Sequence, residues 1–199
     1  MDTPDFEAAK NYSLDRLTRE LPAFLTYHCL THTSEEVVPA ARRIALIEGV
    51  GEEDLLLVTT AAWYHDLGFV QKVVGHELIS IEVACQVLPG FHYSRQQIDR
   101  IAGMILATRL PQSPQNRLEE IVVDADMDVL GRVDFMKRNN DLRLEMAAMG
   151  IQNTDEYWFR MQVAFLQAHH YFTNAAHFLR NEVKQKNIEM MARLHQAAV

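Results

Sequence analysis

The chain has 199 residues, a formal net charge of −8 and an isoelectric point near 5.6. Its length suits one domain, residues 1–199, and 48% hydrophobic with 23% charged residues is ordinary for a folded globular protein. The negative charge disfavours binding to a nucleic acid polymer or to an anionic membrane. A small phosphorylated partner remains compatible with it, because a local cation is enough to offset the acidic background.

Cysteine use and the first residues bear on the compartment. Cys29 and Cys85 form no CxxC pair, so neither a disulfide framework nor a cysteine zinc site is predicted. The acidic start has no apolar signal core, and no run of 18 apolar residues follows it. We therefore expect a cytoplasmic protein with reduced thiols and no membrane span.

Apolar residues recur at spacings of three and four through most of the chain, whereas the alternation typical of strands is hard to find. An all-α fold is therefore predicted. Glycine and proline fall where helices would stop. In chain order, the expected helices cover about residues 4–20, 33–49, 52–66, 76–88, 94–107 and 116–131, followed after 133 by two stretches divided near 150–154, the last broken near 173–174.

Two of these helix starts carry the capping-box pattern, in which a hydroxyl residue is followed three positions later by Glu or Gln. The pairs are Thr33 with Glu36 and Ser94 with Gln97. The first pair predicts that a helix begins at Thr33, so that His32 lies just before its N-terminus.

His65 and Asp66 end the segment DLLLVTTAAWYHDLG, which is apolar on nearly every face and predicts a buried helix. A buried carboxylate must be neutralised by a cation, by hydrogen bonds or by protonation, and a divalent metal ion does this most completely. Taken alone, however, an HD dipeptide is more simply explained as a helix cap.

Asp124 is a second carboxylate in apolar surroundings. Ile121 and Ala125 put it on or beside the core-facing stripe of its helix, whereas a structural Asp usually lies at a cap. For this residue alone, a ligand role and a structural role are evenly balanced.

Histidines supply the remaining candidates. His28 and His32 share one face if the turn between them is helical, where they could bind a metal ion or be ordinary core or surface histidines. His76, at a helix start, and His170, in the aromatic stretch HHYFT, are the other two candidates. The sequence contains no GxGxxG, GxxxxGK[ST], GxSxG or HExxH, so phosphate recognition must rely on metal, side chains or helix N-termini.

Taken in order, His32 in YHCLTHTSEEV, His65 with Asp66 in AAWYHDLG and Asp124 in IVVDADMDVLG resemble the H…HD…D signature of the HD-domain metal-dependent phosphohydrolases. The combination is specific where its single parts are not, and it spans about residues 24–131. The resemblance implies an all-α HD-domain helical bundle with additional C-terminal helices. It also implies that these four residues bind one divalent metal ion.

The same resemblance implies the chemistry. Oxygen and nitrogen ligands without thiolate suit Mn, Fe, Co or Mg, and such an ion lowers the pKa of bound water and polarises a phosphoryl oxygen. The implied function is hydrolysis of a phosphomonoester or phosphodiester, in particular of a nucleotide. Residues 132–199 are expected to wall the pocket and to encode the substrate preference.

Further roles are expected outside the ligand set. By similarity to cyclic-nucleotide phosphodiesterases, where a YH precedes the ligand histidine by four residues, His28 is the candidate acid for the leaving oxygen, with His76 as the alternative. Lys72 and Arg109 are candidates for phosphate contact and His170 for substrate binding. Two-metal relatives insert a further histidine where this chain has IAGMILATRL, so one metal ion is expected.

Two other functions stay open. One is a non-catalytic HD module that binds a nucleotide or a partner as a sensor, and the other is a helical interaction protein without metal. The complete ligand set favours catalysis, because a pure binding module has less need of an ionised Asp in its core. The chain could act as a homodimer, and the sequence leaves that open.

Overall fold

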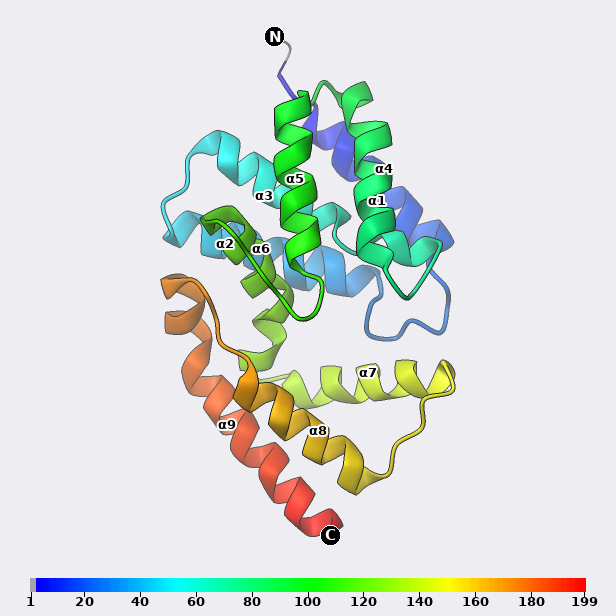
Figure 1. Cartoon of the computed structure of the whole chain (residues 1–199), viewed down its shortest axis with the longest axis vertical. Helices are drawn as coiled ribbons and strands as arrows, with labels where there is room; N and C mark the ends of the chain where they lie inside the picture. The colour runs from blue at the N-terminus through cyan, green and yellow to red at the C-terminus, as the bar shows by residue number, and fades with distance from the viewer. Residues whose placement is uncertain (1–2) are drawn as a thin grey trace.

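The computed structural model describes residues 3–199, and within this range the chain is helical and has no strand. The prediction of an all-α fold is confirmed. Nine α-helices occupy the described range (Figure 1): α1 Phe6–Glu20, α2 Val38–Ile47, α3 Glu52–Tyr64, α4 His76–Val87, α5 Arg95–Ala107, α6 Arg117–Asp126, α7 Phe135–Ala148, α8 Asp155–Ala168 and α9 Asn174–Ala198. Four short turns join them: η1 His32–Val37, η2 Leu67–Val70, η3 Leu88–Phe91 and η4 Met127–Gly131.

One of the two predicted capping boxes is present. The Ser94 hydroxyl accepts from the Gln97 N–H and the Gln97 side chain returns to the Ser94 N–H, so α5 begins as expected. The box of Thr33 with Glu36 is wrong, because the chain is already helical before Thr33, in the single π-helical turn η1. Glu36 is turned to buried charged partners instead of to the backbone.

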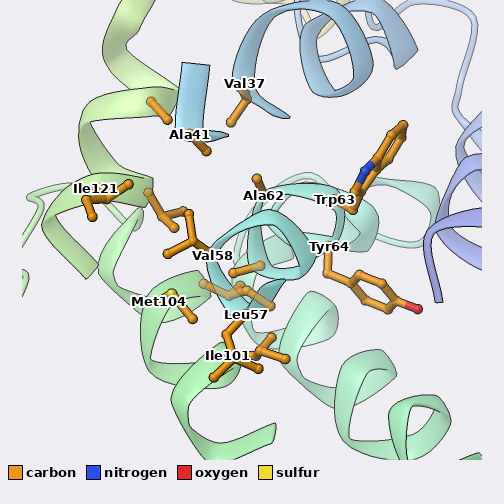
Figure 2. Packing of buried hydrophobic residues seen from close by; sticks show 14 of the residues in the cluster. Val37, Ala41, Leu57, Val58, Ala62, Trp63, Tyr64, Ile101, Met104 and Ile121 are labelled. Carbon is orange, nitrogen blue, oxygen red and sulfur yellow. The ribbon is translucent and has the colours of Figure 1, made fainter. Parts of the chain in front are cut away.

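Helix α3 is the centre of the fold, as its uniform apolar character predicted. It packs against α1, α2, α5 and α6, and its residues from Leu57 to Tyr64 are all buried. Figure 2 shows Val58, Ala62 and Tyr64 leaving this helix in different directions toward neighbouring helices. A helix surrounded in this way has a fixed position, so the residues at its end are held in place by the core.

The last three helices form the lower part of the molecule in Figure 1, below the bundle of α1 to α6. α8 packs on α9, and both α7 and α9 contact η4. A second, smaller apolar cluster lies here and includes Val129, Leu130, Phe135, Leu166 and Met191.

Two glycines permit close contacts between segments that are distant in sequence. A Cβ at Gly68 would clash with the backbone of His76 and Ser80, and a Cβ at Gly131 would clash with Arg180. Gly68 therefore lets the turn after α3 lie against the start of α4, and Gly131 lets η4 lie against α9. Within residues 3–199, no helix combines the length and the apolar character that crossing a bilayer requires.

Candidate metal centre

Three of the four predicted ligands lie together. His32 opens η1, His65 follows the last residue of α3, and Asp66 comes next, so the buried core helix determines the place of two of them. One ligand atom from each residue lies within 4.8 Å of the others, and all three side chains are buried.

Asp126 is the carboxylate that completes the group. It is the last residue of α6, and its Oδ1 lies 3.2 Å from Nε2 of His32 and 3.7 Å from Nε2 of His65. We call His32, His65, Asp66 and Asp126 the His/Asp cluster.

The prediction that Asp124 is the fourth ligand is contradicted by the structure. Its carboxylate oxygens accept the backbone N–H groups of Phe172 and Thr173 and the Thr173 hydroxyl, at distances between 2.7 and 3.1 Å. Burial raises the pKa of Asp124, and these hydrogen bonds lower it only in part. Asp124 thus anchors the segment that leads into α9.

Helix geometry explains why only one of the two carboxylates reaches the cluster. Residues two apart on an α-helix project about 200° apart, so Asp124 and Asp126 face opposite sides of α6. Asp126 follows the buried Val122 by four positions and therefore lay on an apolar face as well. The spacing from Val122 was the sequence feature that could have pointed to Asp126. No sequence rule, however, distinguishes the face of α6 that carries Asp124 from the face that carries Asp126.

Two buried polar atoms of the cluster make no hydrogen bond within residues 3–199. They are Nε2 of His65 and Oδ2 of Asp66, which lie 3.3 Å from each other. Buried polar atoms are nearly always paired, since an unpaired one costs about 1–3 kcal/mol. An imidazole nitrogen and a carboxylate oxygen that lie close together without a hydrogen bond fit a shared divalent cation.

The outer ring nitrogens of both histidines are held so that the inner ones face the cluster. Nδ1 of His32 lies 3.1 Å from Oε2 of Glu36, which also accepts from Arg138, and Nδ1 of His65 lies 2.8 Å from the carbonyl of Ala62. Such outer partners fix the orientation of a ligating imidazole. Glu36 was expected to cap a helix, and its contact with His32 follows from their i,i+4 spacing.

The opposed charges of the cluster shift its pKa values. Burial lowers the pKa of His32, but Asp126 and Glu36 together raise it to about 9. Burial also opposes charge on His65, yet neighbouring Asp66 helps to hold its pKa well above the ordinary value. Conversely, the imidazoles hold the pKa values of Asp66 and Asp126 well below their usual range despite burial. A cation that enters must displace protons from the histidines.

His76 and His28 flank the cluster. Nε2 of His76 lies 3.3 Å from Oδ1 of Asp66, and although burial lowers the pKa of His76, Asp66 raises it above the ordinary value. The ring of Phe69 stacks with His76 at 3.8 Å and with His28 at 4.6 Å between ring centres. Both histidines predicted to have a catalytic role are therefore beside the cluster.

Glu145 is a residue of this site that the sequence analysis missed. It lies on α7, is 1% exposed, and its Oε1 is 2.5 Å from Nδ1 of His28. Its Oε2 accepts the backbone N–H groups of Tyr27 and His28 at 2.8 and 2.9 Å. Burial raises the pKa of Glu145, but its bonds with His28 lower it below the ordinary value. Nothing in DLRLEMAA distinguishes this Glu from a solvent-facing one.

A polar cavity of about 320 Å³ opens beside the cluster and is lined by His28, Asp66, His76, Arg109 and Asp126, among others. The exposed Arg109 thus lines the same cavity as the cluster carboxylates.

Lys72 and His170 are not brought to this cavity. Both are exposed, neither lines it, and the His170 ring lies against the carbonyl of Ala168 at 2.8 Å. The structure therefore gives no support to a substrate-binding role for these two residues.

The fold is similar to that of several solved structures. A predicted HD superfamily hydrolase from an uncultured Thermotogales bacterium matches 98% of this chain and 91% of its own, with a TM-score of 0.61 and 18% identity. A structural genomics target from Lactobacillus plantarum matches 97% of both chains, with a TM-score of 0.68 and 18% identity. Bacillus subtilis YpgQ, solved in complex with ADP, matches 96% of this chain and 97% of its own, with a TM-score of 0.66 and 19% identity.

No protein-family model matches the chain, and the search of curated proteins gives no match. The structural similarities cover nearly the whole length, and they concern the fold. The chain has the HD-domain fold. Within that fold, the His/Asp cluster is a candidate site for a divalent metal ion.

Proposed function

We propose that this protein is a metal-dependent phosphohydrolase that uses the His/Asp cluster to cleave a phosphate ester. One observation carries the proposal: the buried His32, His65 and Asp66 converge with the half-buried Asp126, and Nε2 of His65 and Oδ2 of Asp66 make no hydrogen bond in the described chain. Opposed ionisable groups with strongly shifted pKa values beside a cavity are typical of a catalytic site.

The donor set indicates the kind of ion. His32 and His65 supply imidazole nitrogen and Asp66 and Asp126 supply carboxylate oxygen, which suits Mn, Fe, Co or Mg more than a thiolate-preferring metal. When bound, such an ion supplies a water of lowered pKa and polarises a phosphoryl oxygen.

The other residues of the polar cavity have separate roles. Arg109 binds the phosphoryl group through its guanidinium. His28 donates a proton to the leaving oxygen as its bond to phosphorus breaks and the water oxygen bonds to phosphorus, so that a phosphate product and an alcohol are formed. Glu145 holds the His28 ring through Nδ1, which leaves Nε2 for that proton transfer.

A nucleotide is the substrate class that the sequence resemblance suggested. The observation that favours it is the ADP complex of the structurally similar YpgQ. The polar cavity beside the cluster is the part of this chain that would take the phosphate.

The test combines metal analysis with a substrate screen. The purified protein should contain about one divalent ion per chain after reconstitution with Mn²⁺ or Fe²⁺, and the loaded protein should hydrolyse a member of a panel of nucleotides and simple phosphate esters. Absence of metal after reconstitution would contradict the proposal. Metal and phosphate binding without turnover of any ester would favour a non-catalytic sensor.

A further inference from the structure

A second cavity, of about 420 Å³, adjoins the polar cavity. Its walls come from α7, α8 and η4 and include Phe135, Leu142, Met146, Trp158 and Met161. Protein interiors rarely leave voids larger than a water molecule, and this volume lies in the range of small-molecule pockets. We call it the apolar cavity.

The two cavities lie on either side of a shared wall. Tyr27, His28, Leu110 and Met127 line both of them. A phosphate beside Asp66 and Asp126 would therefore have the apolar cavity next to it, on the other side of His28.

Most side chains that line the apolar cavity are apolar, and the polar ones are Tyr27, His28, Asn139, Asn153, Tyr157 and Gln162. Among the described residues that line it, none is Asp, Glu, Lys or Arg. Of its amides, Asn139 is engaged at both ends, since its oxygen accepts from the Trp158 indole at 2.9 Å and its NH₂ donates to Gln162 at 2.5 Å. Ribose hydroxyls or the polar edge of a base would find few partners here, and burying them unpaired is unfavourable.

We propose that the apolar cavity binds the organic group of the ester, and that this group is an uncharged alkyl or aryl group. The inference rests on the proposed hydrolysis of a phosphate ester, and it names an alkyl or aryl ester in place of the nucleotide that the sequence resemblance suggested. His28 protonates the oxygen that carries the leaving group and also lines the apolar cavity, so the leaving group is directed into it.

The experiment measures binding instead of turnover. Isothermal titration calorimetry of the metal-loaded protein is carried out with n-alkylphosphonates from methyl to hexyl, with benzylphosphonate and with an adenosine 5′-phosphonate. Each methylene buried in the cavity should tighten binding about fourfold, the equivalent of about 0.8 kcal/mol per methylene. Benzylphosphonate should bind more tightly than the adenosine compound.

Two leucines of α7 provide a matched pair of variants. Leu142 lines the apolar cavity, whereas Leu144 is 53% exposed and does not. Leu142→Trp fills the cavity and should abolish the gain with chain length while methylphosphonate still binds, and Leu144→Trp should behave as wild type. Met161→Glu is an independent variant, because Met161 lines the cavity and is 46% exposed. It should also remove the rise of affinity with alkyl chain length.

The outcomes separate the two proposals. If methylphosphonate binds but affinity does not rise with alkyl chain length, the proposal for the apolar cavity is overturned. The proposed phosphohydrolase function is not affected by that result. Tighter binding of the adenosine compound than of every alkyl and aryl phosphonate would assign the cavity to a nucleobase. No binding of any phosphonate by the metal-loaded protein would instead count against the proposed function itself.

Discussion

The His/Asp cluster and the apolar cavity meet at His28, but different parts of the molecule build them. The cluster is placed by η1, α3 and α6, which pack in the large central core. The cavity is walled by α7 and α8, which pack on η4 and α9 in the lower part of the molecule (Figure 1). Glu145 and Arg138 of α7 also bond directly to His28 and Glu36. Ionisable side chains converge at the cluster, whereas the side chains of the cavity are mostly apolar.

This difference assigns the chemistry to the His/Asp cluster and the substrate preference to the apolar cavity. Substitutions at the cluster should alter metal content and turnover, because its two histidines and two carboxylates converge on one point. Substitutions in the cavity should alter affinity for the organic group and leave the metal in place.

The largest effect is expected from the carboxylate of the cluster. Asp126→Ala should lose the metal and reduce turnover by more than the roughly 100-fold that an outer partner costs. Asp124→Ala should retain the metal but lower the free energy of unfolding by about 1–3 kcal/mol, since buried N–H groups of Phe172 and Thr173 lose their acceptor. Elemental analysis and denaturant unfolding measure the two effects. Metal lost from Asp124→Ala and kept in Asp126→Ala would reverse the assignment.

The next largest effect is expected at His28, which lies between the His/Asp cluster and the apolar cavity. His28→Ala should keep the metal and slow turnover about a hundredfold, the usual scale of acid catalysis. Nitrophenyl esters, whose leaving group needs no proton, should be affected much less, and Glu145→Gln should be milder because the imidazole remains. An unchanged rate in His28→Ala would transfer the acid role to His76, and metal loss would make His28 a ligand.

The pH dependence of the metal-free protein should reveal the charge on His32. Its pKa is about 9 in the folded protein against about 6.5 unfolded, so its stabilising protonation is complete below pH 6.5 and is lost as the pH rises through 9. The free energy of unfolding should therefore fall over this range, with a slope of at most about 1.4 kcal/mol per pH unit from this group. The variant His32→Gln should show a smaller fall of the free energy of unfolding over the same pH range. Stability that rises in wild type over this window would contradict the assignment.

A smaller effect is expected at the turn that joins the cluster to α4. Gly68→Ala should lower the free energy of unfolding by about 1–3 kcal/mol, because the added methyl group meets the backbone of His76. Gly90→Ala is the control, since a Cβ there meets nothing within 4 Å. Urea unfolding of the two metal-free variants measures the difference in their free energies of unfolding. Equal stability of both would show that α4 can shift away from the added methyl group at no cost.

The smallest effects are expected where the structure does not bring predicted residues to the cavities. Lys72→Ala and His170→Ala should change kcat and KM less than about twofold, as exposed substitutions away from a site usually do. Arg109→Ala should in contrast raise KM, because Arg109 lines the polar cavity. If Lys72→Ala raised KM as much as Arg109→Ala does, the substrate would have to contact Lys72 outside the polar cavity, and the placement of the phosphate in that cavity would be contradicted.

Local sequence rules predicted much of this fold. The uniform apolar character of 52–66 predicted the buried helix that positions His65 and Asp66, and the start of α5 at Ser94 followed from its capping box. These predictions succeed because spacing within one helix and hydrogen bonds within one turn depend on neighbouring residues alone. The grouping of His32 with the HD pair also agreed with the structure.

What only the tertiary structure decided were contacts between distant segments. Asp124 and Asp126 both lie on apolar faces of one helix, and which face meets His32 depends on how α6 packs. The carboxylate that lies near His32 is therefore two residues after the one that was predicted. Glu145 reaches His28 across 117 positions of sequence, and no local pattern marks it. The sequence by itself determined the helices and the types of side chain at their ends. Packing determined which of those side chains share a buried point, because burial depends on every helix at once.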